Sequence, residues 1–167
     1  MTIHYNMPLI QINSPLPATV TATASARRVT LVSRGLRLPA VLGFGKTVSG
    51  PLHSLTDSSS SDIAFVANSA DWEILSLAAE KGVAGLICPS IAANTLVDWL
   101  DSEPGIFITG QEETLFSLLI LNGIGSASLT KSVLDSLSSV AGRHSALFPE
   151  TKIRAGIHRP FLVISAY

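Results

Sequence analysis

Cys88 is the only cysteine in the 167-residue chain. A single cysteine excludes a disulfide within the chain and a zinc site built from several cysteines, and it fits a reducing compartment. Charge is scarce too, since Asp, Glu, Lys and Arg make up 14% of the residues against the usual proportion of about a quarter. Hydrophobic residues make up 47%, with a mean hydropathy of +0.43. We therefore expect part of the apolar surface to meet a protein partner or a second copy.

Long hydrophobic runs are also missing. The best run, residues 115–121, is interrupted by Ser117 and followed by Asn122 and Gly123, so we expect no membrane span. The N-terminus lacks a basic start followed by an apolar segment, which argues against a signal peptide. These absences and the single cysteine predict a cytoplasmic protein.

The few charges are unevenly distributed along the chain. Residues 1–50 have a net charge of +5 and contain no acid, residues 51–128 have −9, and residues 129–167 have +3. The two ends resemble each other and differ from the middle. We therefore predict that residues 1–55 and 141–167 form one lobe, and that residues 56–140 form a second lobe inserted into it.

Short strands are expected in the first lobe. Residues 18–24 and 27–33 alternate between apolar and polar side chains, which is typical of half-buried strands. Three glycines, Gly43, Gly45 and Gly50, suit the tight corners of a small β-barrel. Strand character returns at residues 144–148, 151–157 and 159–165, which we expect to close this barrel.

The middle of the chain alternates between strand and helix. Residues 63–68, 83–90 and 106–110 are apolar runs typical of strands covered on both faces, and residues 69–82, 92–105 and 112–123 are predicted helices. A fourth helix is predicted at 129–142, and the polar segment 56–62 is predicted to be a hinge. This order indicates a parallel sheet with right-handed crossovers. The expected fold class is α/β: a three-layer lobe, flavodoxin-like or swivelling, inserted into a small β-barrel formed by both termini.

The pattern resembles an uncharacterised bacterial family whose longer members carry an N-terminal lipoyl-like barrel-sandwich hybrid domain. The similarity is to the C-terminal half of those members and runs through "GFGKTVSGPL", "AAEKGVAGLI", "ITGQEE", "NGIG" and the closing "TKIRAGIHRP". It implies architecture and no activity. Where the family has glycine pairs after its first two sheet strands, this chain has Asn68–Ser69 and Pro89–Ser90, which argues against an inherited phosphate or nucleotide site. The lipoyl-like domain is missing from this chain, so we expect it to work beside another polypeptide.

Two groups of residues are candidates for binding. Ligands of open α/β sheets bind beyond the carboxyl ends of the strands. Several polar residues and one glycine follow the predicted strands, and their role as helix caps is favoured over a ligand site: Asn68, Ser69, Asp71, Ser90, Thr109, Gly110, Gln111 and Glu112. The second group is a basic face on the first lobe: Arg27, Arg28, Arg34, Arg37, Lys46, Lys152, Arg154 and Arg159.

No catalytic, metal-binding or cofactor-binding motif is recognisable. The four histidines are scattered and lie outside the middle lobe, no nucleophile elbow is present, and Cys88 is expected to be a buried structural residue. Small basic barrels often bind nucleic acid, but this one has few aromatic side chains for stacking bases. The sequence favours a non-enzymatic interaction or scaffold module, a subunit of an oligomer or larger complex. The alternatives are a small-ligand-binding or enzymatic α/β domain using the strand-end residues, and a nucleic-acid-binding domain using the basic face.

Overall fold

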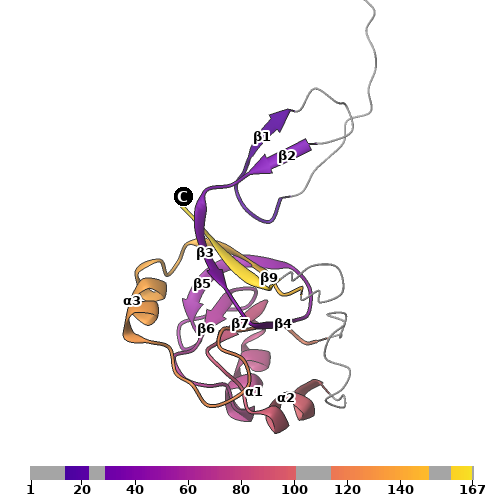
Figure 1. Cartoon of the computed structure of the whole chain (residues 1–167), viewed down its shortest axis with the longest axis vertical. Helices are drawn as coiled ribbons and strands as arrows, with labels where there is room; N and C mark the ends of the chain where they lie inside the picture. Colours follow the sequence, from indigo (N-terminus) through magenta and orange to yellow (C-terminus); the bar gives the residue numbers. More distant parts are fainter. Residues whose placement is uncertain (1–13, 23–28, 101–113, 151–158, 167) are drawn as a thin grey trace, which may run out of the picture.

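A computed structural model of the chain describes residues 14–22, 29–100, 114–150 and 159–166 (Figure 1). It is a mixed α/β fold with three described helices, a large sheet and a separate β-hairpin. The strands are β1 (Thr19–Ala22), β2 (Val29–Val32), β3 (Gly35–Pro39), β4 (Leu42–Phe44), β5 (Val48–Ser54), β6 (Ile63–Phe65), β7 (Gly85–Cys88), β8 (Ser117–Ile120), β9 (His144–Phe148) and β10 (Phe161–Ser165). The helices are α1 (Trp72–Lys81), α2 (Ala93–Leu100) and α3 (Lys131–Ser139).

Eight strands form the large sheet in the order β3-β10-β9-β5-β6-β7-β8-β4. The four central strands, β5 to β8, are parallel. Of these, β6 and β7 lie where parallel strands were predicted, whereas β5 was assigned to the barrel. All residues of β6, β7 and β8 are buried, because both faces of this part of the sheet are covered. Alternate residues of these strands enter two hydrophobic clusters: one contains the buried residues of α1 and α2, and the other contains Leu137 of α3.

The prediction of a helix at 112–123 is wrong for residues 114–123, the part that the structure describes. Residues 117–120 form β8, which pairs with β7 on one side and with β4 on the other. A strand covered on both faces is apolar at every position, so its short run has no period that distinguishes it from a buried helix. The strand predicted at 106–110 lies outside the described residues.

The terminal segments do not form a closed β-barrel, and that prediction is also wrong. β3 and β4 lie at opposite ends of the strand order and do not pair with each other, although only Ala40 and Val41 separate them in the chain. The Ala40 N–H donates to the Pro160 carbonyl at 2.9 Å, and the Val41 N–H donates to the Ile120 carbonyl at 3.0 Å. One short bend thus connects the two ends of a strongly curved sheet, which spans segments from both predicted lobes.

The polar segment 56–62 connects the parallel neighbours β5 and β6. Asp62 is buried and accepts a hydrogen bond from the Ser59 N–H at 2.8 Å. The Lys81 ammonium, at the end of α1, donates to the carbonyls of Thr56 and Ser58 at 2.8 and 3.1 Å. These bonds fix the connection against α1.

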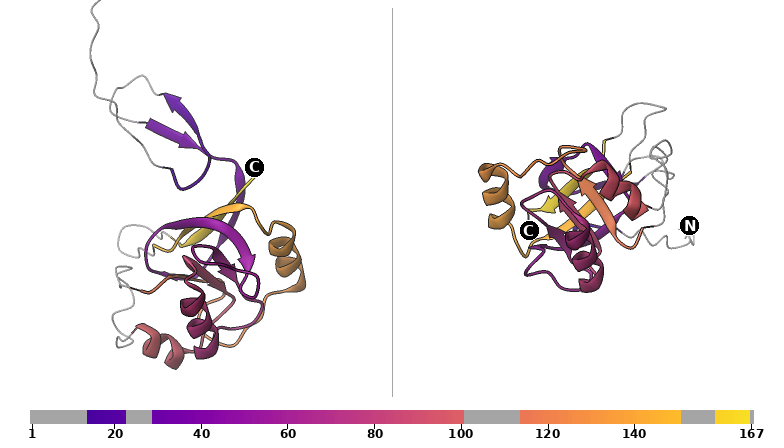
Figure 2. Two further views of the ribbon diagram at one scale, coloured as in Figure 1. Left: turned by 180° about the vertical axis from the view of Figure 1, so that it is seen from behind. Right: turned by 90° about the horizontal axis from the view of Figure 1, so that it is seen from below.

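β1 and β2 form an antiparallel hairpin that is not part of the large sheet. Figures 1 and 2 show it extending from the end of the molecule opposite α1 and α2. The strands predicted from alternation at 18–24 and 27–33 are confirmed where they are described. Within the described part of the chain, no helix has the length and apolar character needed to cross a membrane.

Candidate functional site

Three of the described strand-end residues, Asn68, Asp71 and Ser90, make hydrogen bonds within the protein. Asp71 caps α1, its Oδ1 accepting from the Ile74 N–H at 2.9 Å. Asn68 Oδ1 accepts from the Ser128 hydroxyl at 3.0 Å, and both side chains are exposed. Ser69 is half-buried beside them. The other predicted members, Thr109, Gly110, Gln111 and Glu112, lie outside the described residues.

Ser90 is buried and holds two segments together. Its hydroxyl donates to the Ala127 carbonyl at 3.1 Å and accepts from the Ala127 N–H at 2.6 Å. Parallel bridges from Ala70 to Ile91 and from Ile91 to Ile124 extend the sheet pairing past the ends of the strands. The polar residues at this edge therefore stabilise the loops that connect the strands.

Replacing Ser90 with alanine is expected to lower the free energy of unfolding by about 1 to 3 kcal/mol, because the N–H and the carbonyl of the half-buried Ala127 both lose their partner. Urea unfolding followed by circular dichroism measures the change. Ser128→Ala, which removes an exposed hydroxyl bonded to Asn68, is the control and should cost less than about 0.5 kcal/mol. Equal effects of the two substitutions would contradict the structural role of Ser90.

Cys88 lies at the end of β7, fully enclosed. Burial raises the pKa of its thiol to about 12, and a hydrogen bond with the Ala70 backbone only partly opposes this. The thiol therefore stays protonated at neutral pH, and the thiolate needed for nucleophilic attack is not formed. Within the described ranges, no three His, Cys, Asp or Glu side chains gather as they would to hold a metal ion.

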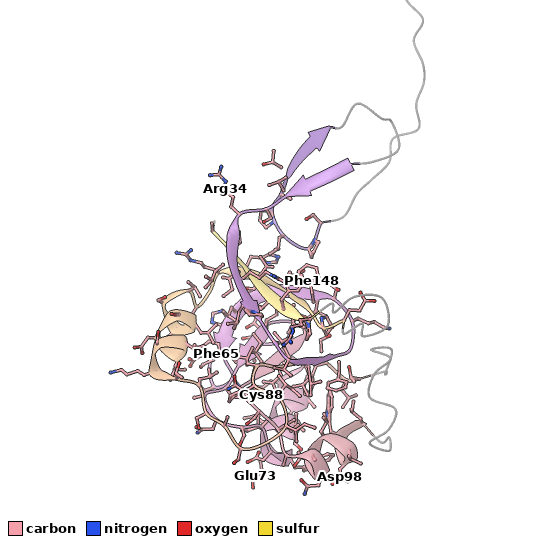
Figure 3. All side chains as sticks on the ribbon, in the orientation of Figure 1. Arg34, Phe65, Glu73, Cys88, Asp98 and Phe148 are labelled. Atoms are coloured by element: carbon pink, nitrogen blue, oxygen red, sulfur yellow. The ribbon has the colours of Figure 1, made fainter. Side chains whose placement is uncertain are left out.

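The basic face is described at Arg34, Arg37, Lys46 and Arg159, all exposed. Arg27, Arg28, Lys152 and Arg154 lie outside the described residues. Lys46 follows β4, where its backbone N–H and carbonyl bond to the Ser117 hydroxyl of β8. Arg34 directly precedes β3 and Arg37 lies in it, at the other end of the strand order (Figure 3 labels Arg34). Arg159 precedes β10, next to Pro160, whose carbonyl accepts from the Ala40 N–H. Of these four residues, Arg34 and Arg37 are the pair that belongs to the edge formed by β3.

Two aromatic rings lie beneath Arg37. Phe161 of β10 stacks on Phe148 of β9 with their centroids 4.7 Å apart, and the Arg37 guanidinium lies 4.3 Å from the Phe161 centroid. A cation over the ring is a favourable arrangement in itself. Because Arg37 already covers Phe161, that ring offers little free face on which a nucleic-acid base could stack.

The outer edge of β3 is a feature that the sequence did not predict. The bonds from Ala40 to Pro160 and from Ala166 to Arg34 show that the even-numbered residues of β3 face β10. Backbone groups alternate in direction along a strand, so those of Gly35 and Arg37 point away from the sheet. No partner for these two N–H groups is found among the described residues. Leu36 and Val32 are also exposed here, by 52% and 50%.

Comparisons with family models, with curated proteins and with solved structures found no match to this chain.

Proposed function

We propose that the chain is a non-enzymatic interaction module, a subunit of an oligomer or larger complex. Its binding surface is the hairpin end, defined here as the β1–β2 hairpin together with β3. The observation that carries the proposal is the outer edge of β3, which no described strand covers. An open strand edge with unpaired N–H groups is a template for an added strand, and such edges are usually covered or blunted.

The hairpin supports the same conclusion. A two-stranded hairpin by itself is marginally stable in water and gains stability by packing on another element. Among the described strands, β1 and β2 pair with each other alone, and β2 leads directly into β3. A partner lying against the hairpin end would cover both the hairpin and the exposed Leu36 and Val32.

The chemistry of the edge indicates what kind of strand would bind there. Arg34 and Arg37 are exposed along it, and like charges facing each other across a strand pair are destabilising. An acidic, extended segment of another protein therefore fits better than β3 of a second copy. A bound strand with alternating acidic and apolar residues would place acidic side chains beside Arg37 on one face and apolar side chains beside Leu36 on the other.

Three further expectations remain proposals of the same kind. Residues 56–140 would be a flavodoxin-like or swivelling lobe, which the β6–α1–β7–α2–β8 alternation supports. Membership in the bacterial family with the lipoyl-like domain rests on the sequence motifs. A cytoplasmic location rests on the single cysteine, which is unpaired and buried.

The test removes one hydrogen-bond donor of the β3 edge, the Arg37 N–H. Arg37→Pro deletes an outward N–H without touching the bonds to β10, and proline is tolerated on edge strands. Arg37→Gln is the matched control, because it loses the same charge and keeps the N–H.

Light scattering gives the mass of each form, and quantitative mass spectrometry identifies the proteins that each form retains from a cell extract. We expect assembly or retention to fall at least about tenfold for Arg37→Pro and less for Arg37→Gln. A monomeric chain that retains no protein, or an unchanged Arg37→Pro, would contradict the proposal.

A further inference from the structure

A crevice of about 460 Å³ opens between α1 and α3, at the carboxyl ends of β5 and β6. Its lining includes the buried Leu55 and Phe65, Ile74 and Leu77 from α1, and Leu134 from α3. Figure 3 labels Phe65, and Figure 1 shows α3 set apart from α1. Crevices outside the carboxyl ends of parallel strands, where connections leave on opposite faces, are the usual binding places of open α/β sheets.

Hydrogen bonds to backbone carbonyls hold the base of this crevice. The Leu55 N–H donates to the Phe65 carbonyl at 3.0 Å, and the Ser58 hydroxyl donates to the Leu55 carbonyl at 2.9 Å. The chain leading to α3 is fixed by the Leu129 N–H, which donates to the Ala67 carbonyl at 2.8 Å. The crevice is therefore bounded by segments that bond to one another, which favours a site formed before the ligand arrives.

The lining has an apolar interior, a polar rim and no ionisable side chain. Its polar side chains are Ser54, Thr56, Asn68 and Ser138. The nearest carboxylate is that of Asp57, which accepts a hydrogen bond from the Ser54 hydroxyl at 2.6 Å. The Lys81 ammonium already donates to two backbone carbonyls. A buried charge needs an opposite charge or several hydrogen bonds to compensate for lost hydration, and this lining offers no cation for an anionic ligand.

We propose that this crevice binds an uncharged, amphipathic small molecule. Its compact apolar body would lie against Phe65, Leu77 and Leu134, and one hydroxyl, carbonyl or N–H group would bond at the rim to Asn68 or Ser138. The volume falls within the usual range for sites of small ligands, about 300 to 1,000 Å³. The site is distinct from the hairpin end, so either proposal can fail without the other.

Two fluorescent probes that differ by one charge test this. N-phenyl-1-naphthylamine is neutral, and 8-anilinonaphthalene-1-sulfonate is the same skeleton with a sulfonate. Titration of each into the full chain is expected to show saturable, one-to-one binding of the neutral probe, at least about tenfold tighter than that of the sulfonate. Equal affinities, or a signal that rises without saturation, would overturn the proposal.

Two substitutions on the same helix locate the site. Leu77→Glu places a charge in the crevice wall at a residue 38% exposed, so the fold should survive it. Trp72→Glu removes an apolar side chain 55% exposed and outside the crevice lining, and is the control. We expect at least a tenfold loss of neutral-probe binding for Leu77→Glu and less than a twofold change for Trp72→Glu.

A third variant, Ser138→Trp, fills the crevice from an exposed position on α3. It should show the same loss of binding if Leu77→Glu misfolds. The proposed site would be contradicted if the folded variants at Leu77 and Ser138 still bound the neutral probe. It would also be contradicted if Trp72→Glu lost as much binding as they do.

Discussion

Replacing Leu119 with alanine is expected to lower the free energy of unfolding by about 2 to 5 kcal/mol. Leu119 lies in the middle of β8 at 0% exposure, opposite Ile87 of β7 and Gly43 of β4. Truncation leaves a cavity that the surrounding strands cannot fill, so the cost includes both lost burial and lost packing. Urea unfolding followed by circular dichroism measures the change.

Two other leucines in the same segment serve as comparisons. Leu118 is also fully buried, but it belongs to the cluster on the opposite face of the sheet, so Leu118→Ala should cost a similar amount. Leu115 is 84% exposed, and Leu115→Ala should change stability by less than about 0.5 kcal/mol. If Leu119→Ala cost no more than Leu115→Ala, the position of β8 inside the sheet would be wrong.

Replacing Gly50 with alanine is expected to lower the free energy of unfolding by about 2 to 3 kcal/mol. Gly50 lies in β5, and a Cβ atom added there would be 2.4 Å from the Ser61 carbonyl oxygen. That oxygen belongs to the backbone of the connection that Lys81 and Asp62 hold against α1, so it cannot rotate away as a side chain would. Thermal unfolding and urea titration of the variant measure the effect.

Gly85→Ala is the matched control for this second prediction. A Cβ atom there would meet the Leu147 Cδ1 atom at 3.0 Å, at the far end of a flexible side chain. We expect Gly85→Ala to cost less than Gly50→Ala, because a side chain adjusts more cheaply than a backbone carbonyl. The reverse order would contradict the close approach of β5 to the 56–62 connection.

The sequence predicted the elements whose signals are local. The helix at 69–82 contains α1, which the Asp71 cap and the left-handed Gly82 delimit, because capping depends on residues within one turn. The apolar runs at 63–68 and 83–90 contain β6 and β7, because a strand covered on both faces needs apolar side chains at every position. Alternation at 18–24 and 27–33 predicted the strands of the hairpin.

The same local reasoning failed where a buried helix and a buried strand have the same apolar pattern. The run around β8 is apolar enough for a buried helix or a buried strand, and only its pairing with β7 and β4 decides between them. The glycines at 43, 45 and 50 indicated tight corners, but not whether the terminal strands would close on one another.

By itself, the sequence determined a mixed α/β chain with strands at β6 and β7, a charge-poor apolar composition and a lone cysteine without an electropositive neighbourhood. Tertiary structure alone decided that the terminal strands join one curved sheet, that no described strand covers the outer edge of β3, and that a crevice lies between α1 and α3. The physical reason is that strand pairing, edges and cavities depend on contacts between residues far apart in the chain. Local side-chain patterns report which surfaces must be buried, but not which distant segment buries them.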